Sequence, residues 1–526
     1  MIDLTPAPSS LLKIITTVAR WSLGLVLAAW FIFGLSWAAL QWVIVPRIGE
    51  FRPQLEAQAT QVLGVPVHIG AITAHSSGMI PSFELTNVEL FDAQGRAALR
   101  LPRVLAALSP RSLWHLGFEQ LYVDRPELNI RRARDGKIYV AGLDFSKNGN
   151  AGTDLADWFF SQIEFAIHAG TIDWTDELRS APPLALKQVE LVVRNKARQH
   201  ELRVDATPPA LWGERFSLRG QLRQPLLSSH NGRWQDWEGQ LYAAFPQVDL
   251  SQLRRYVDAD IELRQGSGAL TTWVDVSRGQ VQAVVADVAL AQVSVKLGAD
   301  LEALELQSVR GRLGGRTLAA GFEFSTQELA FDTRDGLHWP GGNISVQYLG
   351  AEGKIAARGE IKADQLDLAA LSQIVDRLPI DPASRTALLA YAPKGLVQRI
   401  QASWQGPMGA FSQYAVKGLV TEFELAAQNV MPVAHIIANT GAPKASMPTH
   451  SPGVRGASIE FDFNQSSGKA SISMANGALE LPGIFDEAVV AVAQLSTDVK
   501  WQINGERLAV QLPNLKFSNA DAQGEA

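Results

Sequence analysis

Histidine is the side chain in this sequence best suited to catalysis or metal binding, but its spacing gives no site. None of the nine histidines forms a His-Glu-x-x-His pair or another metal-ligand spacing. They are His68, His75, His115, His168, His200, His230, His338, His435 and His450. His168 comes closest to a cluster, because Asp173, Asp176 and Glu177 follow it. In a regular strand over residues 165–174, His168 and Asp173 would point to opposite faces, which argues against a shared site.

Motifs for nucleophiles and phosphate binding are also missing. The chain has no cysteine, which excludes disulfides, thiolate zinc sites, iron–sulfur clusters and cysteine nucleophiles. It has no Gly-x-Ser-x-Gly elbow, and Gly266-Ser267-Gly268 and Gly341-Gly342 lack the strand–helix context of a phosphate loop. The sequence therefore predicts a protein that is not an enzyme and that uses no cofactor or metal. A hydrolase whose triad is dispersed along the chain stays open as an alternative.

The composition is that of a folded protein with few charges. Of the 526 residues, 47% are hydrophobic and 19% are charged, and the net charge is −6. Without a dense basic stripe, nucleic acid is not an expected partner. The chain is too long for one hydrophobic core, so it must divide into domains or extend as a repetitive structure.

The sequence predicts one transmembrane helix over residues 21–45. This run carries no charged residue, has Trp21 and Trp42 near its ends, and is long enough to cross a bilayer. Positive charges close to the run are balanced on its two sides, so they do not fix its orientation. We expect residues 1–20 to be a short cytoplasmic tail. The large body is the part expected to be translocated, judged from its size and its lack of cysteine. The large body then lies on the opposite side of the membrane.

Beyond the anchor, the dominant period of the sequence changes from helical to that of strands. Residues 49–63 predict an amphipathic helix, and from Val65 onward apolar and polar residues alternate in short segments separated by turn signals such as Asn476-Gly477. Short turns predict antiparallel neighbours. The fold class is therefore mainly β, with few helices. Four clear strands supply ten candidate residues for an apolar face: Val293, Val295, Leu297, Ile344, Val346, Ile459, Phe461, Phe463, Leu508 and Val510.

An internal repeat involves two of the few helices. Residues 249–258 (DLSQLRRYVD) and 367–376 (DLAALSQIVD) share an Asp-Leu-x-x-Leu pattern, and each follows a strand. A third helix is expected near residues 382–392, with Asp381 as its N-cap. Two similar helix caps that arose independently are the alternative to a repeat.

Three segments carry a resemblance to a known family. They are FRPQLEAQATQVLGVPVHIGAI at 51–72, LYVDRPELNIRRARDGKIYVAGL at 121–143, and LPIDPASRTALLAYAPKGLV at 378–397. In this arrangement the chain resembles the AsmA-like envelope proteins, most closely the YhdP-like branch. The family's members are usually longer, and the chain ends on a strand, so we expect it to be a truncated N-terminal portion.

The resemblance implies an inner-membrane anchor and, in the periplasm, an elongated, curved antiparallel β-sheet that forms an apolar groove. The ten apolar residues named above would then line this groove and contact lipid. It also implies glycerophospholipid transport toward the outer membrane, with acyl chains and the inner membrane as partners and outer-membrane or envelope proteins as further candidates. We expect residues 46–145 to hold the first β-unit, 146–395 the groove with its helix repeats, and 396–526 its continuation. The alternative is a scaffold for outer-membrane biogenesis without lipid cargo, in which the same apolar residues fill ordinary sandwich cores.

Overall fold

The chain was analysed as a computed structural model, and the structure describes most of it. The described residues are 10–39, 42–43, 45–63, 65–75, 82–91, 97–107, 109, 118–140, 143–144, 157–226, 228, 232–254, 262–380, 382–407, 409–427, 452–482, 487–505 and 507–526. The predicted N-cap Asp381 lies outside them, as do His115, His230, His435 and His450.

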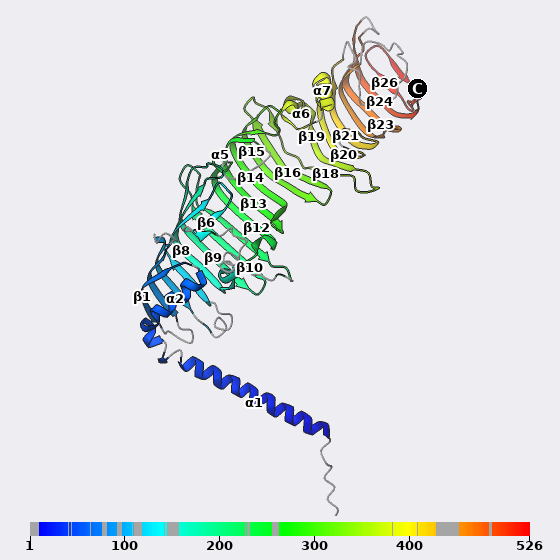
Figure 1. Ribbon diagram of the computed structural model, residues 1–526. Helices are drawn as coiled ribbons and strands as arrows, with labels where there is room; N and C mark the ends of the chain where they lie inside the picture. Colours follow the sequence, from blue (N-terminus) through cyan, green and yellow to red (C-terminus); the bar gives the residue numbers. More distant parts are fainter. Residues whose placement is uncertain are drawn as a thin grey trace, which may run out of the picture. The chain divides into compact units, whose positions relative to one another are not determined.

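The chain divides into two compact units, which are described separately. Unit 1 comprises Met1–Thr207 and Gly220–Trp237, and unit 2 comprises Pro208–Arg219 and Glu238–Ala526. The described strands form one 27-stranded sheet, which confirms the mainly β fold class. Figure 1 labels the elements along the chain.

The helices and strands of unit 1 have the following bounds: α1 (Ser10–Ala39), the 3-10 helix η2 (Val45–Phe51), α2 (Arg52–Leu63), β1 (Val67–His75), β2 (Ser82–Phe91), β3 (Ala97–Ala107), β4 (Gln120–Asp124), β5 (Glu127–Arg132), β6 (Ile138–Val140), β7 (Leu143–Asp144), β8 (Glu164–Asp176), β9 (Leu184–Lys196), β10 (Gln199–Thr207) and η3 (Trp234–Asp236). The strand β11 (Phe216–Arg223) contains the boundary between the units.

Unit 2 contains β12 (Glu238–Asp249), α5 (Leu250–Leu253), β13 (Glu262–Ser277), β14 (Gln280–Lys296), β15 (Leu304–Leu318), β16 (Gly321–Thr333), β17 (His338–Trp339), β18 (Ile344–Leu349), β19 (Arg358–Asp367), α6 (Leu368–Ile374), η4 (Val375–Arg377), α7 (Pro382–Tyr391), β20 (Lys394–Gln405), β21 (Gln413–Leu425), β22 (Gly453–Asn464), β23 (Ser467–Glu480), β24 (Val489–Asn504), β25 (Arg507–Gln511), β26 (Lys516–Ser518) and β27 (Gln523–Glu525). The predicted helices after Asp249 and Asp367 are therefore confirmed, as are the four predicted strands.

The N-terminal helix α1 is suited to membrane anchoring. Its segment Ile15–Ala39 has 25 residues and a mean hydropathy of 1.8, which is long and apolar enough to cross a bilayer. The helix begins earlier than the predicted run of residues 21–45, and α1 ends at Ala39. Arg20 does not interrupt it, because a long arginine side chain near a helix end can extend to the membrane surface.

The helix α2 covers one edge of the sheet of unit 1. Arg52 Nη1 donates to Gly70 O at 3.0 Å, Ile69 N donates to Glu56 Oε1 at 2.7 Å, and Val67 N donates to Thr60 Oγ1 at 3.1 Å. These three α2 residues are four apart, so they form one stripe along the helix. Burial opposes ionisation of Glu56, but the Ile69 N–H and the Arg52 side chain outweigh it and lower the pKa of Glu56. The stripe satisfies backbone groups of β1 that would otherwise form an open edge.

The sheet of unit 1 has a buried apolar face. Directly opposed residues in a ladder lie on the same face, so the register aligns their side chains. One such row runs through β1, β2, β3, β4, β8, β9 and β10: Ile72, Leu85, Val104, Val123, Ile167, Leu191 and Val204. Most of these residues belong to one hydrophobic cluster. Val104, Val123 and Ile167 of this row are buried, whereas Ile72, Leu85, Leu191 and Val204 are half-buried.

Unit 1 departs from the expected antiparallel order at β8. This strand pairs in parallel with β4 and with β5. A parallel neighbour needs a long connection, which the chain between β7 and β8 supplies. The rule that short turns give antiparallel pairs also fails at Arg125-Pro126, because β4 and β5 lie one after the other along β8.

A buried polar network lies at the end of β9 and β10. The His200 ring is 3% exposed, stacks on Trp237 with ring centroids 3.8 Å apart, and shares a 2.7 Å hydrogen bond between its Nδ1 and Asn195 Oδ1. Asn195 Nδ2 in turn donates to Gln162 O. Burial lowers the pKa of His200 to about 4, so the folded chain holds this imidazole neutral.

We expect acid to destabilise unit 1 through His200. An unfolded histidine takes up a proton near pH 6.5, so the contribution to stability is complete above that pH and is lost as the pH falls toward 4. The loss approaches about 3 kcal/mol. Thermal unfolding between pH 7.5 and 4.5 measures how stability depends on pH. The slope of stability against pH should be smaller for His200→Phe than for wild type. Equal slopes in wild type and His200→Phe would contradict the prediction.

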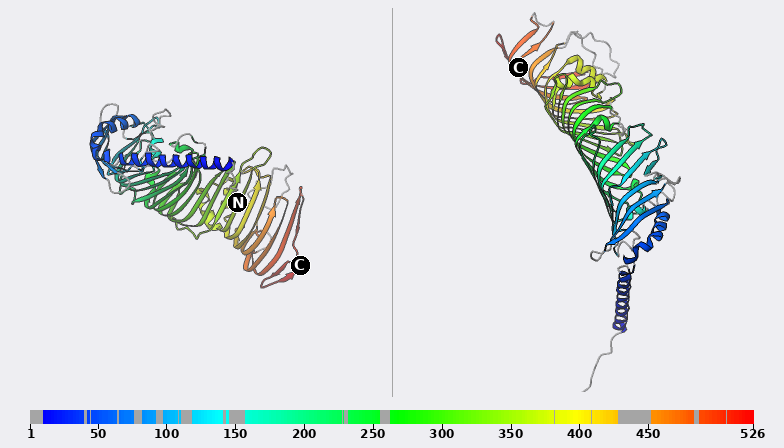
Figure 2. Two further views of the ribbon diagram at one scale, coloured as in Figure 1. Left: turned by 90° about the horizontal axis from the view of Figure 1, so that it is seen from below. Right: turned by 90° about the vertical axis from the view of Figure 1, so that its left-hand side faces the viewer.

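The strands of unit 2 follow one another in sequence order. Each of β12 to β16 pairs antiparallel with the next, β16 pairs with β18, and the order continues strand by strand to β25. Figure 2 shows these strands side by side in two further views. The short turns between them explain this order, since they join neighbours directly.

Three helices lie at one end of the unit 2 strands (Figure 1). The N-cap Asp249 accepts a hydrogen bond from Ser251 N, and the N-cap Asp367 accepts one from Ala370 N, so both Asp-Leu-x-x-Leu segments begin a helix in the same way. Leu250 of α5 and Ala370 and Ile374 of α6 join one hydrophobic cluster. The repeat thus places two similar helices against the same face of the sheet.

Bulges bend the long strands of unit 2. The ladders shift register or skip a residue at non-glycine positions with positive φ. These positions are Gln292, Glu328, Arg399, Glu422 and Asn476, and all five are exposed. A bulge inserts one unpaired residue, bends the strand and reverses which face the next residues occupy. The bulges therefore keep apolar residues on one face where strict alternation would turn them outward.

Candidate apolar path

An unbroken apolar row crosses unit 2. The register aligns one residue from each of thirteen strands, β12 to β16 and β18 to β25, on one face. The central row consists of Leu241, Val274, Val284, Gly315, Phe324, Val346, Ile361, Ala402, Val416, Phe463, Gly468, Trp501 and Val510. Every member is apolar or glycine.

A second row runs beside the central row on the same face. It contains Ala243, Thr272, Ala286, Leu313, Thr326, Ile344, Ala363, Ile400, Gly418, Phe461, Ala470 and Val499, with a bulge in β20 near Ile400. Its two polar members are threonines, and Thr326 Oγ1 accepts a hydrogen bond from Ile344 N. We call these two rows together the apolar face of unit 2.

Much of the apolar face is only partly covered. Phe324 is 42% exposed and Val510 is 49% exposed, and most other members of the central row are half-buried. The described strands belong to one sheet, so no separate second sheet of described strands packs over this face. Apolar side chains that line up and stay in contact with solvent mark a binding surface.

Helices cover the other end of the same face. Val293, Leu304, Leu306, Phe331 and Trp339 are buried there in one cluster with α5 and α6. The face of unit 2 therefore has a closed part under the helices and an open part along the central row.

The structure distributes the ten candidate residues between these parts. Val346, Phe463 and Val510 belong to the central row, and Phe461 and Ile344 to the second row. Val293 is buried in the helix-covered cluster, and Val295 and Ile344 pack against it. Ile459 packs against a smaller cluster around Ala457, Leu508 is 63% exposed, and Leu297 follows the end of β14. Their contact with lipid stays a prediction.

Sequence reasoning missed a group of aromatic residues on the open part. Phe322, Tyr348, Trp404 and Tyr414 lie on successive paired strands, with Gly359 between Tyr348 and Trp404. Neighbouring rings approach one another, as Phe322 and Tyr348 do with centroids 6.0 Å apart. Period-two alternation in each strand was the available signal, but the common row emerges only from the register.

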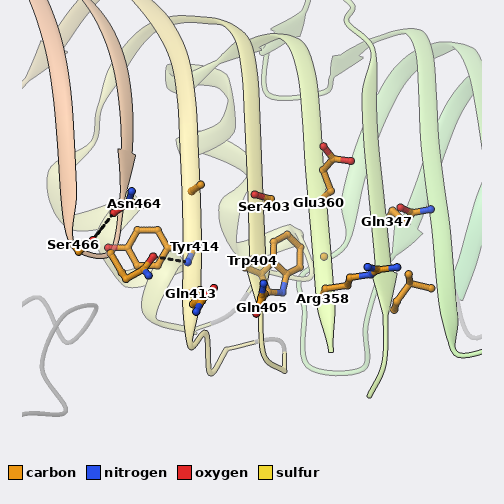
Figure 3. A pocket seen from close by; sticks show the side chains of 14 residues that line it. Gln347, Arg358, Glu360, Ser403, Trp404, Gln405, Gln413, Tyr414, Asn464 and Ser466 are labelled. Atoms are coloured by element: carbon orange, nitrogen blue, oxygen red, sulfur yellow. Dashed lines mark hydrogen bonds between the residues drawn. The ribbon is translucent and has the colours of Figure 1, made fainter. Parts of the chain in front are cut away.

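The opposite face of unit 2 is mostly polar, although Tyr242, Trp273 and Val285 also lie on it. Figure 3 shows Gln347, Glu360 and Ser403 on neighbouring strands, where they line a hollow of about 590 Å³. Farther along, the hydrogen bonds from Arg312 lower the pKa of Asp287, so this pair stays charged. Among the residues that the structure describes, no three His, Asp or Glu side chains form a metal-binding group. The chemistry available to the open apolar face is contact with apolar ligands.

Comparison with known proteins places the chain in a family. Neither the curated proteins nor the solved structures give a match. The family model described as YhdP protein matches residues 1–526, so the chain belongs to the YhdP family.

Proposed function

We propose that the apolar face of unit 2 is a path along which phospholipid acyl chains move. In this proposal α1 anchors the chain in the inner membrane, the body lies in the periplasm, and glycerophospholipids travel toward the outer membrane. The central row, apolar across thirteen strands and only partly covered, is the observation that carries the proposal. Membership of the YhdP family and the apolar helix α1 are consistent with it.

The energetics favour such a path. Burial of each methylene away from water is favourable by about 0.8 kcal/mol. Moving a lipid with about 30 chain methylenes from a bilayer into water therefore costs on the order of 24 kcal/mol. An apolar face offsets most of that cost while the head group stays in water. Weak, uniform contacts suit movement better than one tight site, and the row of valine, isoleucine, leucine and aromatic side chains supplies them.

The length of the central row favours a path for lipids rather than a pocket that holds a single lipid. Twelve steps between neighbouring strands of about 4.8 Å give a row of about 58 Å. One leaflet contributes about 15 Å of hydrocarbon. The row is thus several times longer than the acyl chains of one lipid. We also propose that the chain acts without catalysis, since movement along such a surface requires no bond to be made or broken.

Lipid carried by the body tests the proposal. A protease site inserted between α1 and η2 would release the body, already folded at the membrane, without detergent. We expect mass spectrometry of the extracted body to find phospholipid in stoichiometric or higher amounts. A body that carries no phospholipid would contradict the proposal and favour the scaffold.

A further inference from the structure

Two tryptophans on the apolar face lie opposite glycines. Trp404 pairs with Gly359 across β20 and β19, and Trp501 pairs with Gly468 across β24 and β23. A Cβ atom added to Gly359 would overlap Cζ2, Cε2 and Cη2 of Trp404, and one added to Gly468 would overlap Cζ2 and Cε2 of Trp501. Each indole therefore fills the space above the glycine of the neighbouring strand and lies flat on the sheet.

The flat position changes how far the ring extends from the face. Trp404 is 8% exposed, whereas Phe322 and Phe324 on the same face are 43% and 42% exposed. A ring lying on the backbone raises the surface by about one layer of carbon atoms, about 3.5 Å, whereas an upright indole extends farther.

Hydrogen bonding does not explain this position of Trp404. Its Nε1 is buried and finds no acceptor in the part of the chain that the structure describes. A buried tryptophan N–H normally has a partner, so the ring is placed by its shape. The glycine opposite is the feature that allows this placement.

We propose that the Gly359–Trp404 and Gly468–Trp501 pairs set the clearance of the lipid path. Each pair keeps a large indole low on the face, so that acyl chains can pass above it. Any side chain in place of the glycine forces the indole upright and obstructs the path. This inference rests on the proposed function and adds residues that determine passage through it.

The chain offers a matched control glycine. Gly315 lies in the central row as Gly468 does, but a Cβ added to it meets nothing within 4 Å. Gly315, Gly359 and Gly468 all have backbone conformations outside the positive-φ region, so an L-residue fits each backbone. A substitution at Gly315 therefore adds bulk to the face without displacing an indole.

The test uses the full chain reconstituted through α1 into donor vesicles that contain a fluorescent phosphatidylethanolamine. We expect Gly359→Val to lower the rate of transfer to acceptor vesicles by about tenfold or more, and Gly315→Val to lower it by a smaller factor, because Gly315→Val adds bulk to the central row without displacing an indole. The double variant Gly359→Val with Trp404→Ala should recover most of the wild-type rate, because the displaced ring is gone. Circular dichroism and thermal unfolding check that each variant is folded.

Distinct outcomes separate the two proposals. If Gly359→Val and Gly315→Val slow transfer equally, or if the folded double variant does not recover, the clearance proposal is overturned. If Gly359→Val does not fold, Gly359→Ala replaces it, because the Cβ alone already overlaps Trp404. A wild-type chain that neither carries nor transfers lipid would overturn the proposed function itself.

Discussion

Aspartate in place of Val346 is expected to abolish phospholipid transfer while the chain stays folded. Val346 lies in the central row between Phe324 and Ile361 and is half-buried, so an aspartate there keeps access to water in the empty protein. A passing acyl chain would have to displace that water. Desolvation of an unpaired carboxylate costs at least about 3 kcal/mol, which corresponds to a rate about 100-fold lower. This decrease is measured as the rate of phospholipid transfer between vesicles by the reconstituted chain.

The neighbouring residue supplies the control. Ser345 precedes Val346 on β18 but lies on the polar face, opposite Lys362. Ser345→Asp adds the same charge to the same strand next to a lysine, so we expect transfer and thermal stability close to wild type. Equal transfer by the Val346→Asp and Ser345→Asp variants would show that lipid does not follow the central row.

Alternation within single strands identified some members of the two rows. Val346, Phe463 and Val510 were each predicted as apolar positions of one strand, and the register then places all three in the central row. Alternation reveals the two faces of a strand because successive side chains point in opposite directions. It says nothing about which residues of other strands lie alongside.

Bulges explain where the alternation rule fails. Leu290 and Val293 are an odd number of residues apart, yet both are buried in the same cluster, because Gln292 between them adopts φ of 51° and is skipped in the ladder. Glutamine is not a residue that signals a positive φ, so this bulge could not be predicted from the residue types. The covering helices were predicted, but the residues beneath them were not.

The Gly–Trp pairs could not be predicted from the sequence for a different reason. Gly359 and Trp404 are far apart in the sequence, and an isolated glycine within a strand pattern normally suggests a bulge or a turn. Its role depends on which residue the partner strand places opposite. That information lies in the register, which depends on every turn and bulge between the two strands.

Aspartate in place of Val293 is expected to have the opposite consequence to aspartate at Val346, namely unfolding. Val293 is 4% exposed, and it packs in the cluster that α5 and α6 cover. Its Cγ2 atom lies 3.3 Å from where a Cβ on Gly266 would be, and Leu250 of α5 approaches the same point. A carboxylate there would be buried without a partner. We expect a destabilisation of more than about 4 kcal/mol, measured as a lower urea midpoint and faster proteolysis of unit 2.

Gln292→Asp is the matched control for this second variant, because Gln292 is exposed at the adjacent bulge and aspartate tolerates a positive φ. It should change the urea midpoint little. The comparison also separates the two parts of the apolar face, since the same substitution at Phe461, in the open second row, should stop transfer without unfolding the chain. If Val293→Asp also leaves the fold intact, the helices do not seal their end of the face. In that case the lipid path extends beneath α5 and α6.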